Sequence, residues 1–206
     1  MKQIILLDID GTVLQWQANL AFYCHDQGIK SDYALQMLLN EDFVEPSKLF
    51  GVSSRLAEQY IHDYNMSDYC RTLPAYRDAL EFIEKYKEKY DFIAVTKFSK
   101  NPVALSNRMY NLHTLFPDAF KDIYSCDFSE SKSEILEELK HKYRERIVMF
   151  VDDQVSNIDA SIGIFGSSIE HILLTRGGKQ VKTWYSDYFQ VESLMAIDVP
   201  DNSLPF

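Results

Sequence analysis

Three features are scarce in this sequence: cysteine, long apolar runs and positive charge. The 206 residues include only three cysteines, Cys24, Cys70 and Cys126. Their odd number and wide spacing favour free thiols in a reducing cytosol over disulfides or a metal site, so we expect a cytoplasmic protein. No apolar run reaches the roughly 18 residues that a membrane span needs, and we expect no membrane partner. An apolar run starts almost at Met1, so we expect no signal peptide.

Positive charge is outweighed by negative charge, because 21 Lys and Arg face 31 Asp and Glu, for a formal net charge of −10. This excess argues against nucleic acid or an anionic membrane as a partner. It does not exclude a small phosphorylated substrate, because one local cation can dominate a site. Apolar residues make up 46% of the chain, which suffices for a full core in one main domain with a small insert.

The most informative segment runs from Ile4 to Thr12. Four apolar residues lead into two carboxylates, Asp8 and Asp10, and a Gly-Thr pair follows directly. Side chains two residues apart on a strand point the same way, so both carboxylates should meet at the end of a buried strand. Adjacent buried carboxylates repel each other and need a cation or protons. The alternative is a strand end capped by solvated aspartates, but one Asp without Gly-Thr would serve for that.

Apolar runs that end in a polar residue recur along the chain and predict a parallel sheet. Runs without alternation are typical of strands buried on both faces. The expected strands are 4–7, 92–95, 123–126, 147–151 and 171–174. The expected helices between them are 76–90, 102–115 and 131–143. This alternation of strands and helices predicts a doubly wound, Rossmann-like α/β fold with a parallel sheet.

In such sheets the active site lies at the carboxyl ends of the strands. Three runs end at Asp8, Thr96 and Asp152, which should therefore share one edge of the sheet. Together with Asp153 and a lysine that opens a predicted helix, Lys132, they form an acidic pocket with one cation. Mg²⁺ prefers such oxygen ligands together with a substrate phosphate. A carboxylate can attack phosphorus, and a second carboxylate can protonate the leaving oxygen.

These motifs resemble, in order, those of the haloacid dehalogenase-like superfamily, which consists mostly of Mg²⁺-dependent phosphohydrolases. An apolar strand followed by D-x-D-G-T occupies 6–12, and a strand that ends in Thr occupies 92–96. A Lys that opens a helix lies in 131–136, and a strand that ends in paired acids occupies 149–153. The resemblance covers about residues 2–178. Its first motif is the most specific, and the lone Thr and Lys gain weight only from their positions.

The resemblance implies a role for each matching residue. Asp8 would be the nucleophile that forms an aspartyl-phosphate, and Asp10 the general acid and base, whose backbone carbonyl also binds Mg²⁺. Thr96 and Lys132 would be catalytic residues that bind the phosphoryl group and offset its charge. The implied metal ligands are Asp8, Asp10, Asp152 and Asp153. The candidate substrate-binding residues are Trp16, Thr96, Lys97, Lys132 and Asn157. Dehalogenating members lack an acid at the position of Asp10, so phosphoryl chemistry is favoured.

Each candidate also has a purely structural interpretation. Thr96 could simply end a strand, and Lys97 and Lys100 compete with Lys132 for the role of the site cation. The acid pair at 152–153 could cap the following helix, whose N-terminus favours acids. Asn157 could be an ordinary helix residue. The segment Arg176-Gly177-Gly178 is typical of a turn, with a phosphate contact from the arginine as the alternative.

Residues 14–74 break the alternation of strands and helices. No connection of this length is needed between adjacent α/β elements, so we predict an inserted helical subdomain, with 1–13 and 75–206 as the α/β core. In the superfamily such an insert forms a cap that excludes water and selects the substrate. Trp16, close to Asp10 in sequence, is expected to face the site. Most other aromatic residues are expected to form the core of the insert, although they could stack a nucleobase: Phe22, Tyr23, Phe43, Phe50 and Tyr60.

The leading expectation is a Mg²⁺-dependent phosphomonoesterase that hydrolyses a small phosphorylated metabolite, with a nucleoside monophosphate as a natural candidate. The alternatives with the same site are a sugar-phosphate phosphatase and a phosphomutase, in which a substrate hydroxyl replaces water. A non-enzymatic binding module is disfavoured, because it has no reason to keep Asp10 beside Asp8. A nucleic-acid end phosphatase is disfavoured by the net charge of −10 and by the lack of a basic aromatic stripe.

Overall fold

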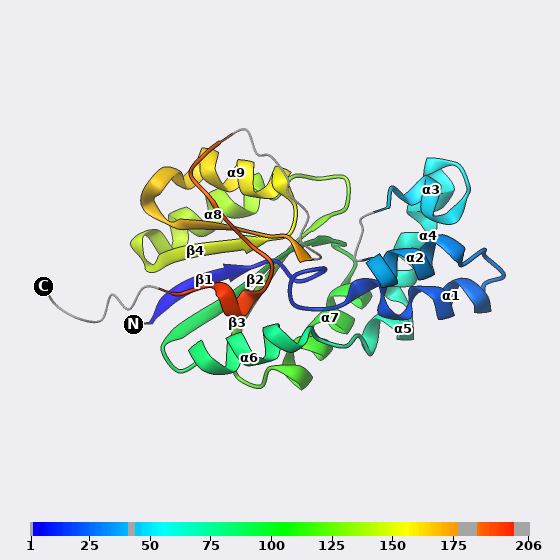
Figure 1. Cartoon of the computed structure of the whole chain (residues 1–206), viewed down its shortest axis with the longest axis horizontal. Coiled ribbons are helices and arrows are strands. Elements are labelled where there is room, and N and C mark those ends of the chain that lie inside the picture. The colour runs from blue at the N-terminus through cyan, green and yellow to red at the C-terminus, as the bar shows by residue number, and fades with distance from the viewer. Residues whose placement is uncertain (1, 41–43, 177–184, 200–206) are drawn as a thin grey trace, which may run out of the picture.

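A six-stranded parallel sheet forms the centre of the molecule, in the order β3-β2-β1-β4-β5-β6 (Figure 1). The structure, a computed structural model, describes residues 2–40, 44–176 and 185–199. The strands are β1 (Gln3–Leu7), β2 (Tyr90–Phe98), β3 (Phe120–Asp127), β4 (Ile147–Asp152), β5 (Glu170–Leu174) and β6 (Phe189–Val191). The strand order reverses between β1 and β4, and ligands bind at such switch points. The predicted doubly wound α/β fold is confirmed.

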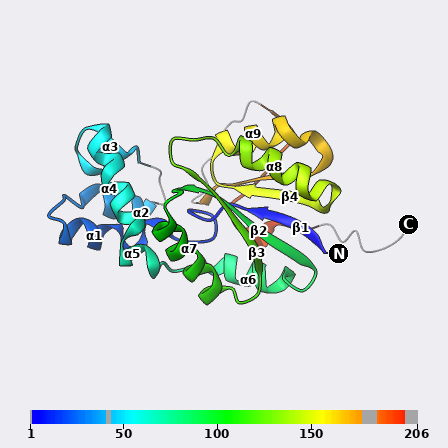
Figure 2. The same cartoon turned by 180° about the vertical axis from the view of Figure 1, so that it is seen from behind.

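Helices cover both faces of the sheet (Figures 1 and 2). They are α6 (Arg77–Tyr86) and α7 (Pro102–Leu115) on one face, and α8 (Ser133–Tyr143) and α9 (Val155–Phe165) on the other. Ile5 and Leu7 of β1 pack in the core on the side of α6 and α7. Ile4 and Leu6 pack in the core on the side of α8 and α9. Both faces of β1 are therefore buried, which explains its unbroken apolar sequence.

Between β1 and α6 the chain forms a group of helices beyond the carboxyl ends of the central strands (Figure 1). After a 3₁₀ turn at Trp16–Asn19, they are α1 (Leu20–Asp26), α2 (Asp32–Asn40), α3 (Pro46–Phe50), α4 (Ser54–Met66) and α5 (Asp68–Arg71). These helices enclose their own hydrophobic cluster, which includes Leu20, Tyr64 and Leu73. The division of the chain at residues 14 and 74 stays a prediction.

The predicted elements form, with three differences, the first of which is that the helix expected at 76–90 ends at Tyr86 and Tyr90 already belongs to β2. All five expected strands are present, and α7 has the predicted bounds. Strand β2 continues two residues beyond Thr96, because its ladder with β3 extends to the pair of Phe98 and Asp127. The sequence did not predict β6, whose first two side chains are exposed, so that no apolar run marks it.

Two further observations concern the cysteines and the lengths of the helices. All three cysteines are buried and free of disulfides, as predicted. No helix within the described ranges is long and apolar enough to cross a membrane.

The aromatic residues of the insert divide into buried and exposed. Tyr23 and Phe50 are buried in its hydrophobic cluster, and Tyr60 packs against them. The prediction for Phe22 was wrong, because this side chain is 64% exposed. On α1 the buried positions are 20, 23 and 24, which leaves residue 22 on the solvent face. Phe43 lies outside the described residues.

Candidate active site

The pairing of β1 with β4 brings the first two aspartates together. Leu7 lies opposite Val151 in the register, so Asp8 and Asp152 follow side by side. Lys132, the residue before α8, is fully buried between them. Its Nζ lies 2.5 Å from Asp8 Oδ1 and 2.7 Å from Asp152 Oδ2, and it also donates to the carbonyl of Val95 at 2.7 Å. Lys132, and not Lys97, is therefore the cation at the centre of this cluster.

Burial and charge shift the pKa values of the cluster in a way that favours a bound cation. Burial raises the pKa of Asp8 to about 7, although Lys132 acts in the opposite direction. Burial, together with the nearby carboxylates, raises the pKa of Asp153 well above its usual value. Burial alone would lower the pKa of Lys132, but Asp152 and Asp8 outweigh that effect and raise it. One ammonium thus faces several crowded carboxylates, which a divalent cation would stabilise.

The arrangement of the carboxylates fits a hard cation such as Mg²⁺. Asp8, Asp152 and Asp153 each place one oxygen within 4.8 Å of the others. Asp8 Oδ2 is buried and has no hydrogen-bond partner among the described residues. Gly11 has a φ of +91°, and a Cβ there would lie 2.4 Å from Asp153 Oδ2. The absence of that Cβ lets the loop pass close to the carboxylates, and oxygen ligands are those that Mg²⁺ prefers.

Asp152 is also held by the start of α9. Asn157 donates from its side-chain amide to both Asp152 oxygens, at 3.0 and 3.1 Å, and the backbone N–H of Gln154 donates to Oδ1 at 2.8 Å. The hydrogen bond to Gln154 is the local role that the helix-capping interpretation describes. The amide of Asn157, a predicted substrate-binding residue, is occupied by this contact. Its position therefore suits fixing Asp152.

Asp10 has a partner that the sequence analysis missed. Arg108 on α7 places its Nη2 2.8 Å from Asp10 Oδ1 and donates to Oδ2 at 3.0 Å. Burial raises the pKa of Asp10, and Arg108 opposes that shift. One signal could have identified this residue, because Arg108 lies in phase with the buried Ala104 and Leu112 on one helix face. An arginine at an apolar position of an amphipathic helix indicates a buried ion pair.

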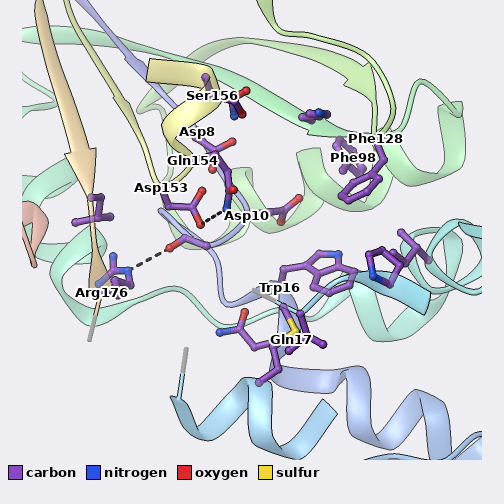
Figure 3. A pocket seen from close by; sticks show the side chains of 18 of the residues that line it. Asp8, Asp10, Trp16, Gln17, Phe98, Phe128, Asp153, Gln154, Ser156 and Arg176 are labelled. Atoms are coloured by element: carbon purple, nitrogen blue, oxygen red, sulfur yellow. Dashed lines mark hydrogen bonds between the residues drawn. The ribbon is translucent and has the colours of Figure 1, made fainter. Parts of the chain in front are cut away.

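A pocket of about 590 Å³ separates the strand ends from the helical insert. Asp8, Asp10 and Asp153 lie on one side of it, and Trp16 and Gln17 lie across from them (Figure 3). We call the side formed by the strand ends and the loops after them the floor, and the side formed by residues 16–65 the roof. The insert therefore contributes directly to the lining of the pocket.

The other predicted site residues occupy different positions around this pocket. Lys97 lines it, with Nζ 5.8 Å from the centre of the Phe128 ring. Trp16 lines it too, and its Nε1 donates to Asn65 at 2.9 Å. Thr96 is fully buried and is not part of the lining, and its Oγ1 has no hydrogen-bond partner among the described residues. Phe128 was missed, because no pattern in the sequence distinguishes it from a surface aromatic residue.

Arg176 connects the loop after β1 to the rest of the core. It donates to both oxygens of Asp78 at 3.0 Å, and to the carbonyls of Gly11 at 3.2 Å and Thr12 at 2.8 Å. Its guanidinium also lies 3.7 Å from the centre of the Tyr76 ring. These contacts use most of its N–H donors and give Arg176 a structural role, and Arg176 also lines the pocket. The two glycines of the predicted turn, at positions 177 and 178, lie outside the described residues.

Solved structures with a similar architecture include haloacid dehalogenase-like hydrolases. A haloacid dehalogenase-like family hydrolase from Streptococcus pneumoniae matches with a TM-score of 0.62 and 14% identity, over 95% of this chain and 96% of that chain. YfnB from Bacillus subtilis, described as a HAD hydrolase and bound to magnesium, matches with a TM-score of 0.61 and 17% identity, over 95% and 96%. CbbY from Rhodobacter sphaeroides, in complex with phosphate, gives 0.60 and 14%, over 94% and 95%.

The chain therefore has the haloacid dehalogenase-like fold, and the resemblance predicted from the motifs is confirmed at the level of the fold. In sequence, the chain is 39% identical over 159 residues to an uncharacterized 32.4 kDa protein in the Gp30-rIII intergenic region of Enterobacteria phage T4. The match covers 77% of this chain and 56% of that protein, so the chain spans little more than half of its relative. No family model matches the sequence.

Proposed function

We propose that this protein is a Mg²⁺-dependent phosphatase that hydrolyses a small phosphomonoester through an aspartyl-phosphate on Asp8. The observation that carries the proposal is the ammonium of Lys132 between Asp8 and Asp152, while Asp8 lines the pocket and its Oδ2 has no partner among the described residues. A carboxylate attacks phosphorus readily only where nearby positive charge offsets the phosphoryl oxygens. The magnesium and the phosphate named for two structural neighbours support the same chemistry.

The reaction would proceed in two steps that share one acid. A carboxylate oxygen of Asp8 attacks phosphorus, the ester P–O bond breaks, and Asp10 gives its proton to the departing oxygen. Water then attacks the aspartyl-phosphate, Asp10 takes the proton of that water, and inorganic phosphate leaves as Asp8 is restored. Burial raises the pKa of Asp10 above its usual value, which favours its holding the proton that the first step needs.

The remaining site residues would bind and neutralise the transferring group. Lys132 offsets the charge on Asp8 and on the phosphoryl oxygens, and the buried hydroxyl of Thr96 is proposed to donate to them. When bound, Mg²⁺ supplies further positive charge at the phosphoryl oxygens. The groups proposed to hold it are the side chains of Asp8, Asp152 and Asp153 and the backbone carbonyl of Asp10.

The lining of the pocket supports a small substrate with a flat apolar part. Its volume of about 590 Å³ suits a metabolite. Trp16, Phe98 and Phe128 supply aromatic surface, and Lys97 supplies positive charge. We therefore propose a nucleoside monophosphate as the first substrate to test, ahead of a sugar phosphate. The three free cysteines support a reducing compartment such as the cytosol.

The decisive experiment measures phosphate release from a panel of nucleoside monophosphates and sugar phosphates with Mg²⁺. We expect Asp8→Asn to lower turnover by about a thousandfold or more, because the amide is nearly the same size but cannot attack phosphorus. Asp122→Asn, on the exposed edge of β3, is the matched control and should keep wild-type rates. Excess chelator should stop the wild-type reaction, and added Mg²⁺ should restore it.

Each result has a distinct meaning. Wild-type rates in Asp8→Asn would show that the nucleophile is assigned wrongly, and full activity in excess chelator would refute the metal site. A preference for sugar phosphates would overturn the nucleotide assignment and leave the phosphatase assignment standing. A lack of Asp8-dependent release from every ester would refute hydrolysis and favour phosphotransfer or a binding role.

A further inference from the structure

Asp10, an acid that lines the pocket, is contacted on its side away from the pocket by the buried Arg108. The side chain of Arg108 is 1% exposed, whereas that of Asp10 is 16% exposed. Asp10 lines the pocket and Arg108 does not. The guanidinium of Arg108 also lies 4.8 Å from the centre of the Phe98 ring, and Phe98 is part of the lining. Arg108 therefore makes no direct contact with the pocket and is separated from it by Asp10 and Phe98.

The backbone of α7 is fixed on either side of this arginine. Asn107 donates to the carbonyl of Ser67 at 3.1 Å, and Asn111 donates to the carbonyl of Cys70 at 2.7 Å. These amides hold α7 against α5 of the insert, so the arginine between them is fixed before any ligand binds. Little side-chain entropy is then lost when Asp10 is held in one orientation.

A purely structural explanation accounts poorly for an arginine here. Its Nε and Nη1 have no hydrogen-bond partner among the described residues, although both are buried. Unpaired buried donors are costly. The buried residues one turn before and one turn after Arg108, Ala104 and Leu112, are apolar, whereas the buried Asn107 and Asn111 have hydrogen-bond partners in the insert. The ion pair of Arg108 is with Asp10, and this charged contact is the one that an apolar side chain at position 108 would lack.

We propose that Arg108 is a positioning residue, which fixes the carboxylate of Asp10 so that it faces the oxygen that leaves phosphorus. The proposal rests on the phosphatase function proposed above. In the first step Asp8 forms a bond to phosphorus, the ester P–O bond breaks, and the departing oxygen receives the proton of Asp10. An alkoxide needs that proton, whereas a nitrophenolate leaves without it. The loss of kcat/KM on removal of Arg108 should therefore be larger for an ester with an alkoxide leaving group than for one with a nitrophenolate leaving group.

The test compares kcat/KM for propyl phosphate and para-nitrophenyl phosphate, because kcat/KM reports the steps up to departure of the leaving group. We expect Arg108→Met to lower kcat/KM for propyl phosphate about a hundredfold and for para-nitrophenyl phosphate less than tenfold. Arg108→Lys keeps a cation without the fork of donors and should show a smaller selective loss, about tenfold. Asn111→Ala loosens the same helix without touching Asp10, and it should affect both esters equally.

A double-mutant cycle separates positioning from general destabilisation. In an Asp10→Asn background, Arg108→Met should cause no further selective loss, because the arginine acts through that one carboxylate. An equal loss on both esters, or an effect that adds fully to that of Asp10→Asn, would overturn the proposal. If Arg108→Met does not fold, as judged by circular dichroism, Arg108→Lys decides by the same ratio. Wild type that cleaves neither these two esters nor any phosphomonoester of the panel above would refute the phosphatase function itself, which distinguishes the two failures.

Discussion

The floor and the roof of the pocket are built in different ways. The floor presents charged side chains whose positions are fixed by buried ion pairs, as in the contacts of Asp8 with Lys132 and of Asp10 with Arg108. The roof carries no charged side chain among its described lining residues, which are Trp16, Gln17, Met37, Val44, Pro46, Leu49, Ile61 and Asn65. Charge development needs fixed dipoles, whereas apolar contact tolerates small shifts. Under the function proposed above, this difference favours chemistry at the end of the sheet and contact of the insert with the organic part of the substrate.

The largest expected contrast is between two glycines, one in each region. Gly11→Ala in the floor forces a side chain to 2.4 Å from Asp153 Oδ2 at a φ of +91°, whereas Gly51 in the insert has a φ of +65° and nothing within 4 Å of its Cβ position. We expect each variant to lose about 1–2 kcal/mol of unfolding free energy from backbone strain. Only Gly11→Ala should also lose activity, by about a hundredfold, and weaken Mg²⁺ binding in a calorimetric titration.

The control in this pair is Gly51→Ala, which carries the same kind of backbone strain without the clash. If both variants kept full activity, the close approach of the loop to Asp153 would be irrelevant to catalysis. If both lost activity equally, strain and not the clash would be the cause, and the contrast between floor and roof would fail.

The second prediction concerns the contacts of Arg176 that hold the loop after β1 in the floor. Arg176→Met removes an arginine that is 12% exposed from its pair with Asp78 and from the carbonyls of the loop after β1. We expect the unfolding free energy to fall by about 3 kcal/mol, because a mostly buried carboxylate loses its partner. Arg77→Met is the matched control: its ion pair with Glu81 is on the surface, and its loss should change stability by less than about 0.5 kcal/mol. Urea unfolding of both variants measures the difference, and equal losses would contradict the structural role of Arg176.

Much of the floor could be predicted from the sequence, because local pattern determines it. An apolar run buried on both faces predicts a central parallel strand, and the side chains at the carboxyl ends of such strands must share one edge. Asp8 and Asp152 followed from that rule alone. Lys132 needed the resemblance to a family, because lysines that open helices are common and three-dimensional contact singles out this one.

The missed residues depend on contacts between segments far apart in the chain. Arg108 stood out by its phase on α7, but its partner Asp10 lies 98 residues away and no local pattern connects them. Phe22 was assigned to the core from its aromatic character, although the spacing of the buried residues on α1 places it on the solvent face. Local sequence thus predicts which face is buried better than it predicts which residues meet across elements.

The smallest expected effect is in the roof. Trp16→Phe keeps an aromatic ring but removes the 2.9 Å hydrogen bond from Nε1 to Asn65, which orients the tryptophan at the pocket. We expect KM for the preferred phosphomonoester to rise about fivefold, in line with about 1 kcal/mol for one hydrogen bond, while kcat stays within twofold. Phe22→Ala changes an exposed aromatic residue of the insert that does not line the pocket, and it should leave both constants unchanged. A fall in kcat as large as the rise in KM would show that Trp16 acts in the transition state as well. The roof would then share in the chemistry, and the distinction between floor and roof would have to be abandoned.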